Sequence, residues 1–368
     1  MKLYRDFKKP ALLIDEKKCR ENIRMMVAKA RKHKVIFRPH FKTHQSLETG
    51  RWFRDEGVDR ITVSSVEMAQ YFSPEWNDIT IAFPVNIPEI DEINELAAKI
   101  NLNILAESAE TVSFLKENLR HKTGIFIKID IGNHRTGLQP DNFSEINKIL
   151  DISYSSEKLS FRGFLGHAGQ TYHCRSADEI KDIQKKSLYI MEGLKKNFII
   201  KYPDLLISTG DTPGCSICDK FSGTDEIRPG NFVFYDLMQL EIGSCIEEQI
   251  AVAMACPIVA VHKERGEIVI YGGGIHFSKD RIDDITVGTV YGRIAGKKGN
   301  GWGKIIPDMF LKSLSQEHGI VSAPAEEISG YKIGDILFVI PVHSCMTADI
   351  MKRYFTLEGN EIMMMMKF

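Results

Sequence analysis

Short apolar runs alternate with stretches of helical periodicity along most of this chain, and this alternation limits the possible folds more than any other feature. Residues 16–33 are an example, because their apolar side chains recur at helical spacing. The apolar runs, each predicted to be a β-strand, are residues 11–15, 34–37, 60–63, 78–82, 102–105, 125–130, 159–165 and 204–208. Strands that alternate with helices pair in parallel through crossover helices. Roughly eight such units favour a (β/α)8 barrel over an open sheet.

The pattern changes after about residue 245. Short apolar runs at 251–255, 268–271 and 336–340 are separated by glycine, proline and charged turns, and helical periodicity is weak. This arrangement predicts a smaller, mostly β domain. A chain of 368 residues is also longer than one hydrophobic core usually serves. We therefore expect two domains, with the barrel over residues 16–245.

Composition excludes several classes of partner. The net charge is −1, which gives no electrostatic reason to bind nucleic acid or an anionic membrane. The N-terminus lacks the apolar core of a signal peptide, and the longest apolar run, 250–261, is too short to span a bilayer. That run contains Pro257 and is predicted to be a core strand. Seven scattered cysteines fit reduced thiols, so a cytoplasmic location is expected.

Polar residues with chemical potential follow the predicted strands. In a barrel the chemistry lies on the loops after the strands. Lys42 is the main candidate, because it follows the second predicted strand and stands between His40 and His44. Partial burial and nearby cations favour the neutral amine, which makes such a lysine a good nucleophile. The alternative is an ordinary basic surface loop.

Three further loops offer groups to the same barrel mouth. Small residues in the loop Thr209, Gly210, Asp211 and Thr212 allow backbone N–H groups to approach an anion such as phosphate, although an ordinary turn would look alike. Arg135 follows the sixth strand and can pair with an anionic oxygen. His167 and Tyr172 follow the seventh strand. Tyr235 lies in residues 228–236, which could form a second polar edge of the mouth.

A pair of possible metal ligands lies far away in the sequence. His343 and Cys345 follow the apolar run 336–340, and on extended chain residues two apart project to one face. Imidazole and thiolate together suit zinc. Two ligands are too few for a closed structural site, so open positions would make the site catalytic. The alternative is a core cysteine beside a surface histidine.

Taken together, these motifs resemble the fold-type III pyridoxal-phosphate enzymes, in the branch of D-serine dehydratase and D-threonine aldolase. The matching motifs are residues 10–15, 38–44, 134–137, 208–213, 228–230 with 235–236, 272–274 and 343–345. They span nearly the whole chain in the expected order. The resemblance implies an alanine-racemase-like barrel and a β domain formed by residues 1–15 plus 246–368. It also implies a homodimer with the active site near the interface.

The resemblance also implies roles for single residues. Lys42 would form the covalent link to pyridoxal phosphate, Arg135 would approach the phenolic oxygen of the ring, and Tyr172 would sit near the pyridine nitrogen. Residues 209–212 and Tyr235 would hold the phosphate. The remaining expected residues are His40 and His167 for the cofactor, and His343 and Cys345 for a divalent metal.

The implied reaction starts on a D-3-hydroxy amino acid. A metal near its hydroxyl group allows elimination of water, which leads to an α-keto acid and ammonia, or cleavage of Cα–Cβ to glycine and an aldehyde. In the family, cysteine as the second ligand resembles the zinc dehydratases, whereas aldolases tend to carry aspartate and use manganese. Cys345 therefore favours the dehydratase over the aldolase. A racemase, which needs no metal, and a non-catalytic carrier, which normally lacks a second domain, are further alternatives.

Overall fold

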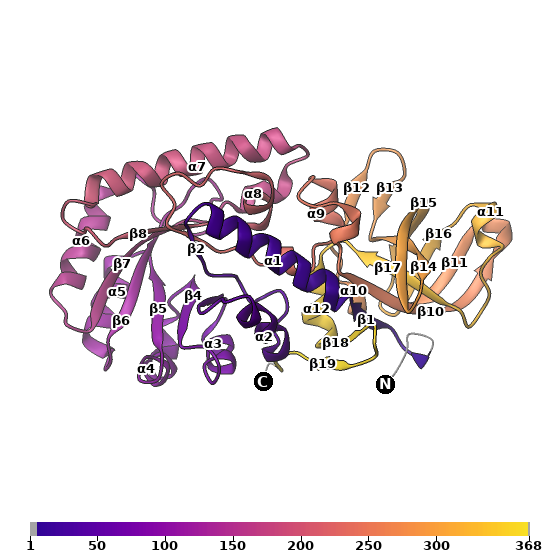
Figure 1. The fold of residues 1–368 in the computed structure, drawn as a ribbon, viewed down its shortest axis with the longest axis horizontal. Coiled ribbons are helices and arrows are strands. Elements are labelled where there is room, and N and C mark those ends of the chain that lie inside the picture. The colour runs from indigo at the N-terminus through magenta and orange to yellow at the C-terminus, as the bar shows by residue number, and fades with distance from the viewer. Residues whose placement is uncertain (1–5, 367–368) are drawn as a thin grey trace.

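The structure is a computed structural model that describes residues 6–366. A barrel with surrounding helices is followed by a strand-rich domain, and the two lie side by side (Figure 1). In this part of the chain, eight helices follow strands in an alternating series. Their bounds are α1 (Glu16–Lys32), α2 (Leu47–Asp55), α3 (Val66–Phe72), α4 (Ile90–Ala97), α5 (Ala109–Asn118), α6 (Phe143–Tyr154), α7 (Ala177–Phe198) and α8 (Thr212–Ile217).

Within residues 6–366, eight parallel strands form the barrel sheet in the order β2-β9-β8-β7-β6-β5-β4-β3. Hydrogen bonds at a parallel bridge between His40 and Thr62 join the chain after β2 to β3. These bonds link the two ends of the sheet, so the predicted (β/α)8 barrel is confirmed. The strands are β2 (Ile36–Phe37), β3 (Ile61–Val63), β4 (Asp78–Pro84), β5 (Asn101–Ala106), β6 (Thr123–Lys128), β7 (Leu159–Leu165), β8 (Leu206–Thr209) and β9 (Glu226–Ile227).

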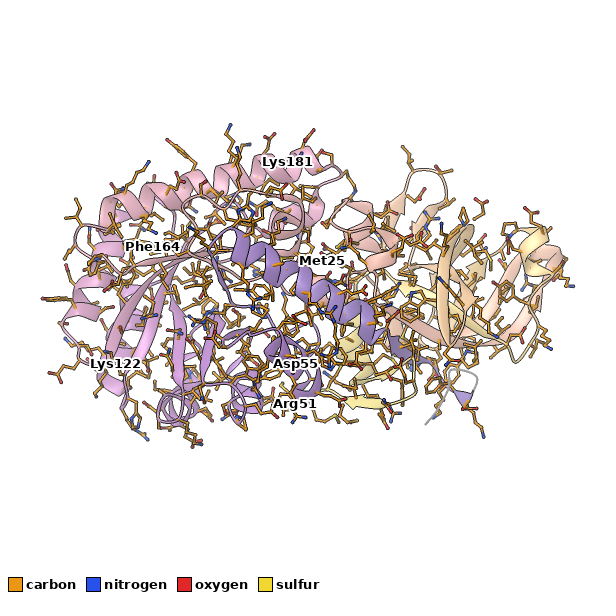
Figure 2. The ribbon with its side chains drawn as sticks, in the orientation of Figure 1. Met25, Arg51, Asp55, Lys122, Phe164 and Lys181 are labelled. Atoms are coloured by element: carbon orange, nitrogen blue, oxygen red, sulfur yellow. The ribbon has the colours of Figure 1, made fainter. Side chains whose placement is uncertain are left out.

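Serine caps explain where several barrel helices begin. Ser46, Ser65 and Ser108 each precede a helix and accept a hydrogen bond from the backbone N–H three residues on. Such a cap satisfies one of the unpaired donors of a helix N-terminus. The helices then bury one face on the barrel: Phe164 of β7 packs against Phe198 of α7, with ring centroids 5.4 Å apart, while Lys181 of α7 points outward (Figure 2).

The membership of the barrel differs from the prediction at two strands. The first predicted strand forms β1 (Ala11–Ile14), which lies in the other sheet, antiparallel to β10 and parallel to β18. The missing barrel strand is β9, which has only two residues and contains the charged Glu226. Lys42 therefore follows the first barrel strand and not the second.

The second domain is built on a mixed sheet that has nine strands in the described part of the chain, in the order β11-β16-β15-β14-β17-β10-β1-β18-β19. Its strands are β10 (Val252–His262), β11 (Glu267–Tyr271), β14 (Gly292–Lys298), β15 (Gly301–Leu314), β16 (His318–Ser322), β17 (Ile336–Pro341), β18 (Arg353–Thr356) and β19 (Glu361–Met363). The smaller elements are the hairpin β12 (Ile282–Asp284) with β13 (Gly288–Val290), and the helices α9 (Leu237–Glu241), α10 (Gly274–Phe277), α11 (Ala325–Ile328) and α12 (Ser344–Met351). Among residues 6–366, no helix is long and apolar enough to cross a membrane.

A buried network of charged side chains links several strands of the barrel. Arg38, only 2% exposed, donates to the carboxylates of Glu226 and Asp78 at 2.6 Å each. Glu226 also accepts from Ser208, whose hydroxyl oxygen accepts from Arg228. The network joins strands β2, β4, β8 and β9, and its members are up to 188 residues apart in the sequence.

We expect Arg38→Met to destabilise the barrel strongly. The substitution leaves the Glu226 carboxylate buried without its cation, which typically costs about 3 to 5 kcal/mol. The half-buried Arg60, paired with the exposed Asp59, gives a control, because Arg60→Met should cost about 1 kcal/mol or less. Chemical unfolding followed by circular dichroism measures both. Equal stability of the two variants would contradict the role of the network.

Candidate active site

The segment that carries Lys42 is anchored by its neighbours. Phe41 is fully buried, and its ring lies 4.3 Å from that of His44 and 5.0 Å from that of Phe53. Gln45, at a positive φ of 46°, donates from its side chain to the Lys42 carbonyl at 3.0 Å. Lys42 itself is exposed. The loop is therefore held rigidly while its amine stays accessible at the barrel mouth.

His40 and His167 lie close to the Lys42 amine and are held neutral. Burial, and then repulsion by the Lys42 ammonium, lower the pKa of His167 to about 3 and that of His40 well below its ordinary value. His167 Nδ1 lies 3.4 Å from the Gly210 carbonyl, to which it can donate. This contact brings the loop after β7 against the predicted phosphate loop.

The predicted phosphate loop has the shape of an anion cradle at Gly210. The φ of Gly210 is 116°, and a Cβ there would lie 2.9 Å from the backbone nitrogen of Arg228, so no larger residue fits. Thr212 lies deeper: its hydroxyl accepts from the Phe232 N–H at 3.3 Å. The Thr209 hydroxyl pairs with that of Thr224 at 3.2 Å.

Asp211 has a structural task within the same loop. Its Oδ1 caps α8 by accepting from the Gly214 N–H at 2.7 Å, and it also accepts from the Thr171 hydroxyl at 2.8 Å. Its Oδ2 is buried with no hydrogen-bond partner among residues 6–366, and burial raises the pKa of this carboxyl to about 6. Because a carboxylate oxygen accepts hydrogen bonds, a bound group that satisfies this orphaned oxygen must bring a donor.

Tyr172 and Tyr235 flank this loop from two sides. Burial raises the pKa of the Tyr172 phenol, which hydrogen-bonds with Thr212 and lies near Cys345. Tyr235 is buried, takes a positive φ of 49°, and its hydroxyl lies 3.0 Å from that of Ser216 in α8. Tyr172 therefore stands between the phosphate loop and the proposed metal ligands.

Arg135 is exposed in the loop after β6. The buried Lys128 lies near it: burial, and then repulsion by Arg228 and Arg135, lower the pKa of Lys128 to about 8. Lys128 was not predicted, because a lysine at the end of an apolar strand looks like an ordinary strand terminus. With Lys42 and Arg228, these residues make the mouth strongly cationic, as an anionic cofactor and substrate require.

His343 and Cys345 do meet, but not on a strand. His343 precedes α12 with an extended backbone, and Cys345 lies in the first turn of that helix. The prediction of a shared strand face is therefore wrong, because the chain turns into a helix directly after His343. Burial opposes both shifts, but interactions with Asp280 and then with Cys345 raise the pKa of His343, and the interaction with His343 lowers that of Cys345.

The barrel holds Cys345 in place from the other side. The Thr43 hydroxyl lies 3.1 Å from the Cys345 sulfur, and the Asn231 amide donates to it at 3.5 Å. Asp236 is fully buried and accepts from the Ser344 backbone N–H at 2.9 Å, from the Ser344 hydroxyl at 3.0 Å and from Asn231 at 2.6 Å. Asp236 thus fixes the start of α12 between the two proposed ligands.

The donor set fits a divalent metal with open coordination positions. Within residues 6–366, no three His, Cys, Asp or Glu side chains are grouped so as to bind one ion. An imidazole and a thiolate that share a proton can exchange that proton for a soft metal. Sequence reasoning assigned no role here to Thr43, Asn231, Asp236 or Asp280, because their partners are remote in sequence.

Comparisons with known proteins agree with this geometry. Residues 14–237 match the family described as alanine racemase, N-terminal domain, and residues 251–357 match the putative serine dehydratase domain. A D-serine dehydratase of Dictyostelium discoideum is 28% identical over 381 aligned residues, which cover 95% of this chain and 93% of that protein.

Solved structures share the fold. The D-threo-3-hydroxyaspartate dehydratase of Delftia sp. HT23 superposes with a TM-score of 0.92 at 23% identity, covering 100% of both chains, and a metal-free mutant form of it superposes equally well. The D-threonine aldolase of Filomicrobium marinum gives a TM-score of 0.83 at 17% identity, over 99% of this chain and 97% of that one. The match to the alanine racemase N-terminal domain covers most of the barrel and more than half of the sequence. The chain therefore belongs to this family, that of the fold-type III pyridoxal-phosphate enzymes.

Proposed function

We propose that this protein is a pyridoxal-phosphate- and metal-dependent lyase that removes water from a D-3-hydroxy amino acid, yielding an α-keto acid and ammonia. The observation that carries the proposal is the contact between Thr43 and Cys345, 3.1 Å long. Thr43 is the sequence neighbour of the candidate base Lys42 and contacts the candidate metal ligand Cys345. Elimination of water needs both functions, because a proton leaves Cα while a hydroxyl group leaves the neighbouring carbon.

The chain offers a complete set of groups for the cofactor. Lys42 would bind it covalently, the loop from Thr209 to Thr212 would hold its phosphate, and Arg135 and Tyr172 would contact the ring. Tyr235, His40 and His167 would line the same cavity. Pyridoxal phosphate supplies an electron sink for the negative charge that develops at Cα.

Lys42 would be the group that moves the proton: with cofactor and substrate bound, its Nζ would accept the proton from Cα. The rigid anchoring of Phe41 and Gln45 keeps that amine within a small volume, which favours a productive geometry. The neutral imidazoles of His40 and His167 can accept or donate hydrogen bonds without adding charge to the site.

His343 and Cys345 would hold the metal, for which we propose zinc because a thiolate and an imidazole suit it better than manganese. A metal at this place supplies Lewis acidity toward the 3-hydroxyl group. The ligand Cys345 also favours a dehydratase over an aldolase, in which aspartate is expected. The D-serine dehydratase is 28% identical to this chain and the D-threonine aldolase 17%, which supports the same choice.

We expect the enzyme to be a cytoplasmic homodimer. All seven cysteines of the chain lie in its described part and are free thiols, which suits a reducing compartment. The dimer follows from the family resemblance. Light scattering of the purified protein, which measures its mass in solution, tests it.

Lys42→Ala should abolish the absorbance near the edge of the visible range that the lysine-bound cofactor gives. Lyase activity should fall by about 10³-fold or more, because a positioned base is lost. Absorption spectra and a keto-acid assay measure the two effects. Lys32→Ala removes an exposed lysine of α1 and should change neither. If the absorbance band persists in the Lys42 variant, the cofactor is bound elsewhere.

A substrate screen separates the dehydratase from the aldolase. We expect D-serine to yield pyruvate and ammonia, and D-threonine to yield 2-oxobutanoate and ammonia, with little product from the L-amino acids. Mass spectrometry of the products gives the answer. Glycine and acetaldehyde from D-threonine, with no pyruvate from D-serine, would instead identify an aldolase.

Removal of the metal tests the second half of the site. Chelation, or the variant Cys345→Ala, should lower activity at least about 10²-fold, because Lewis-acid assistance to the hydroxyl group is lost. Added zinc should restore the chelated wild type but not the variant. Cys19→Ala, a buried cysteine in the core of α1, should retain its zinc. Racemisation of an amino acid that survives chelation would support a racemase instead.

A further inference from the structure

Next to His343 lies a segment whose backbone is held in an uncommon conformation. After α10 the chain reaches Ser278, which takes φ 71° and ψ −173°. A residue with a side chain rarely adopts these angles, so the backbone is strained at Ser278. Ser278 is nearly buried, at 8% exposed. Strain of this kind persists only where the surroundings enforce it, so the segment must be fixed by specific contacts.

Two of those contacts involve one carboxylate, that of Asp280, and a third joins the segment to α12. The Ser278 hydroxyl donates to Asp280 Oδ2 at 2.8 Å, and the Asp280 N–H donates back to the Ser278 oxygen at 3.1 Å. The carbonyl of Phe277 accepts from the Thr347 hydroxyl of α12 at 3.0 Å. The strained segment is therefore joined to the helix that carries Cys345, and its only described acidic side chain near that helix is Asp280.

Asp280 faces one particular nitrogen of the proposed metal ligand. Its Oδ2 lies 3.4 Å from His343 Nδ1. Histidines that bind metals usually donate their second ring N–H to a carboxylate, which fixes the tautomer and the ring orientation. Asp280 itself does not complete a three-ligand group within residues 6–366. The carboxylate is thus placed to act through the histidine.

We propose that Asp280 is a positioning residue that holds His343 by Nδ1 and so presents Nε2 to the divalent metal, and that the strained Ser278 keeps the carboxylate in place. This inference rests on the proposed metal site. It adds to that site the tautomer of His343 and the residue that holds its ring. A Cβ at Gly273 would lie 2.3 Å from the Gln316 carbonyl oxygen, so glycine lets the start of α10 approach the turn between β15 and β16.

The test is the zinc affinity of the cofactor-loaded protein, measured by competition with a fluorescent chelator. We expect Asp280→Ala to weaken zinc binding about 10- to 100-fold, the usual loss when such a support is removed. Asp280→Asn should keep affinity within about 3-fold of the wild type, because its amide oxygen still accepts from Nδ1. Asp283→Ala is the matched control: this carboxylate is exposed, pairs with Arg281 and should leave affinity unchanged.

Two results would overturn the inference. Wild-type affinity in Asp280→Ala would show that His343 needs no support. An Asp280→Asn variant as weak as Asp280→Ala would make Asp280 a direct ligand, because an amide oxygen is a poor substitute for a bound carboxylate. Failure of the proposed metal site itself is distinguishable, since the wild-type protein would then bind no zinc in the same titration.

A second background separates positioning from general stability. In a His343→Ala protein, the further change Asp280→Ala should not lower the remaining metal affinity, because the residue that Asp280 supports is gone. An additional loss there would contradict the proposal. Ser278→Gly should weaken zinc binding several-fold while thermal stability holds or rises, since glycine relieves the strain but removes the hydroxyl group. A variant that kept full affinity would remove Ser278 from the mechanism.

Discussion

One buried carboxylate, Asp236, ties the two domains together at the point where the chemistry is proposed. Lys42 belongs to the barrel and Cys345 to the second domain, and the contact between Thr43 and Cys345 joins residues 302 positions apart. Asp236 accepts three hydrogen bonds from Ser344 and Asn231 around that contact. Because a buried carboxylate without partners is costly, this network resists any shift of α12 away from the barrel.

The charges of the barrel mouth form a second constraint. Lys42, Lys128 and Arg228 are close enough for their charges to influence the same histidine, His167. Burial lowers the pKa of Arg228 to about 10, and the nearby Glu226 carboxylate opposes this effect. A dianionic phosphate and a substrate carboxylate would relieve the remaining repulsion. The free protein is therefore arranged electrostatically for anions before any of them binds.

The fold class could be predicted from the sequence, and the errors in the strand assignment have physical causes. Residues 11–15 were counted among the eight strand–helix units, although the family resemblance puts them in the β domain, because a strand buried on both faces looks the same in either sheet. β9 was missed because Glu226 looks like a surface residue, and its burial makes sense only beside Arg38, 188 residues away. Lys42, His343 and Cys345 stood in distinctive local motifs. Thr43 lies in the same motif as Lys42, but its contact and that of Asp280 could not be predicted, since their partners come from remote segments.

The position of His343 and Cys345 at a helix start has a consequence for the reaction. A strand would aim both side chains along one direction, whereas the turn from extended chain into α12 lets them converge on one point. Cys345 is then held by Thr43, the residue next to Lys42. The two atoms that must leave a 3-hydroxy amino acid, the Cα proton and the 3-hydroxyl oxygen, sit on adjacent carbons. The proposed base, Lys42, and the proposed metal ligand, Cys345, are joined through Thr43 and match that short separation, so we expect any loosening of Thr43 to separate the two steps.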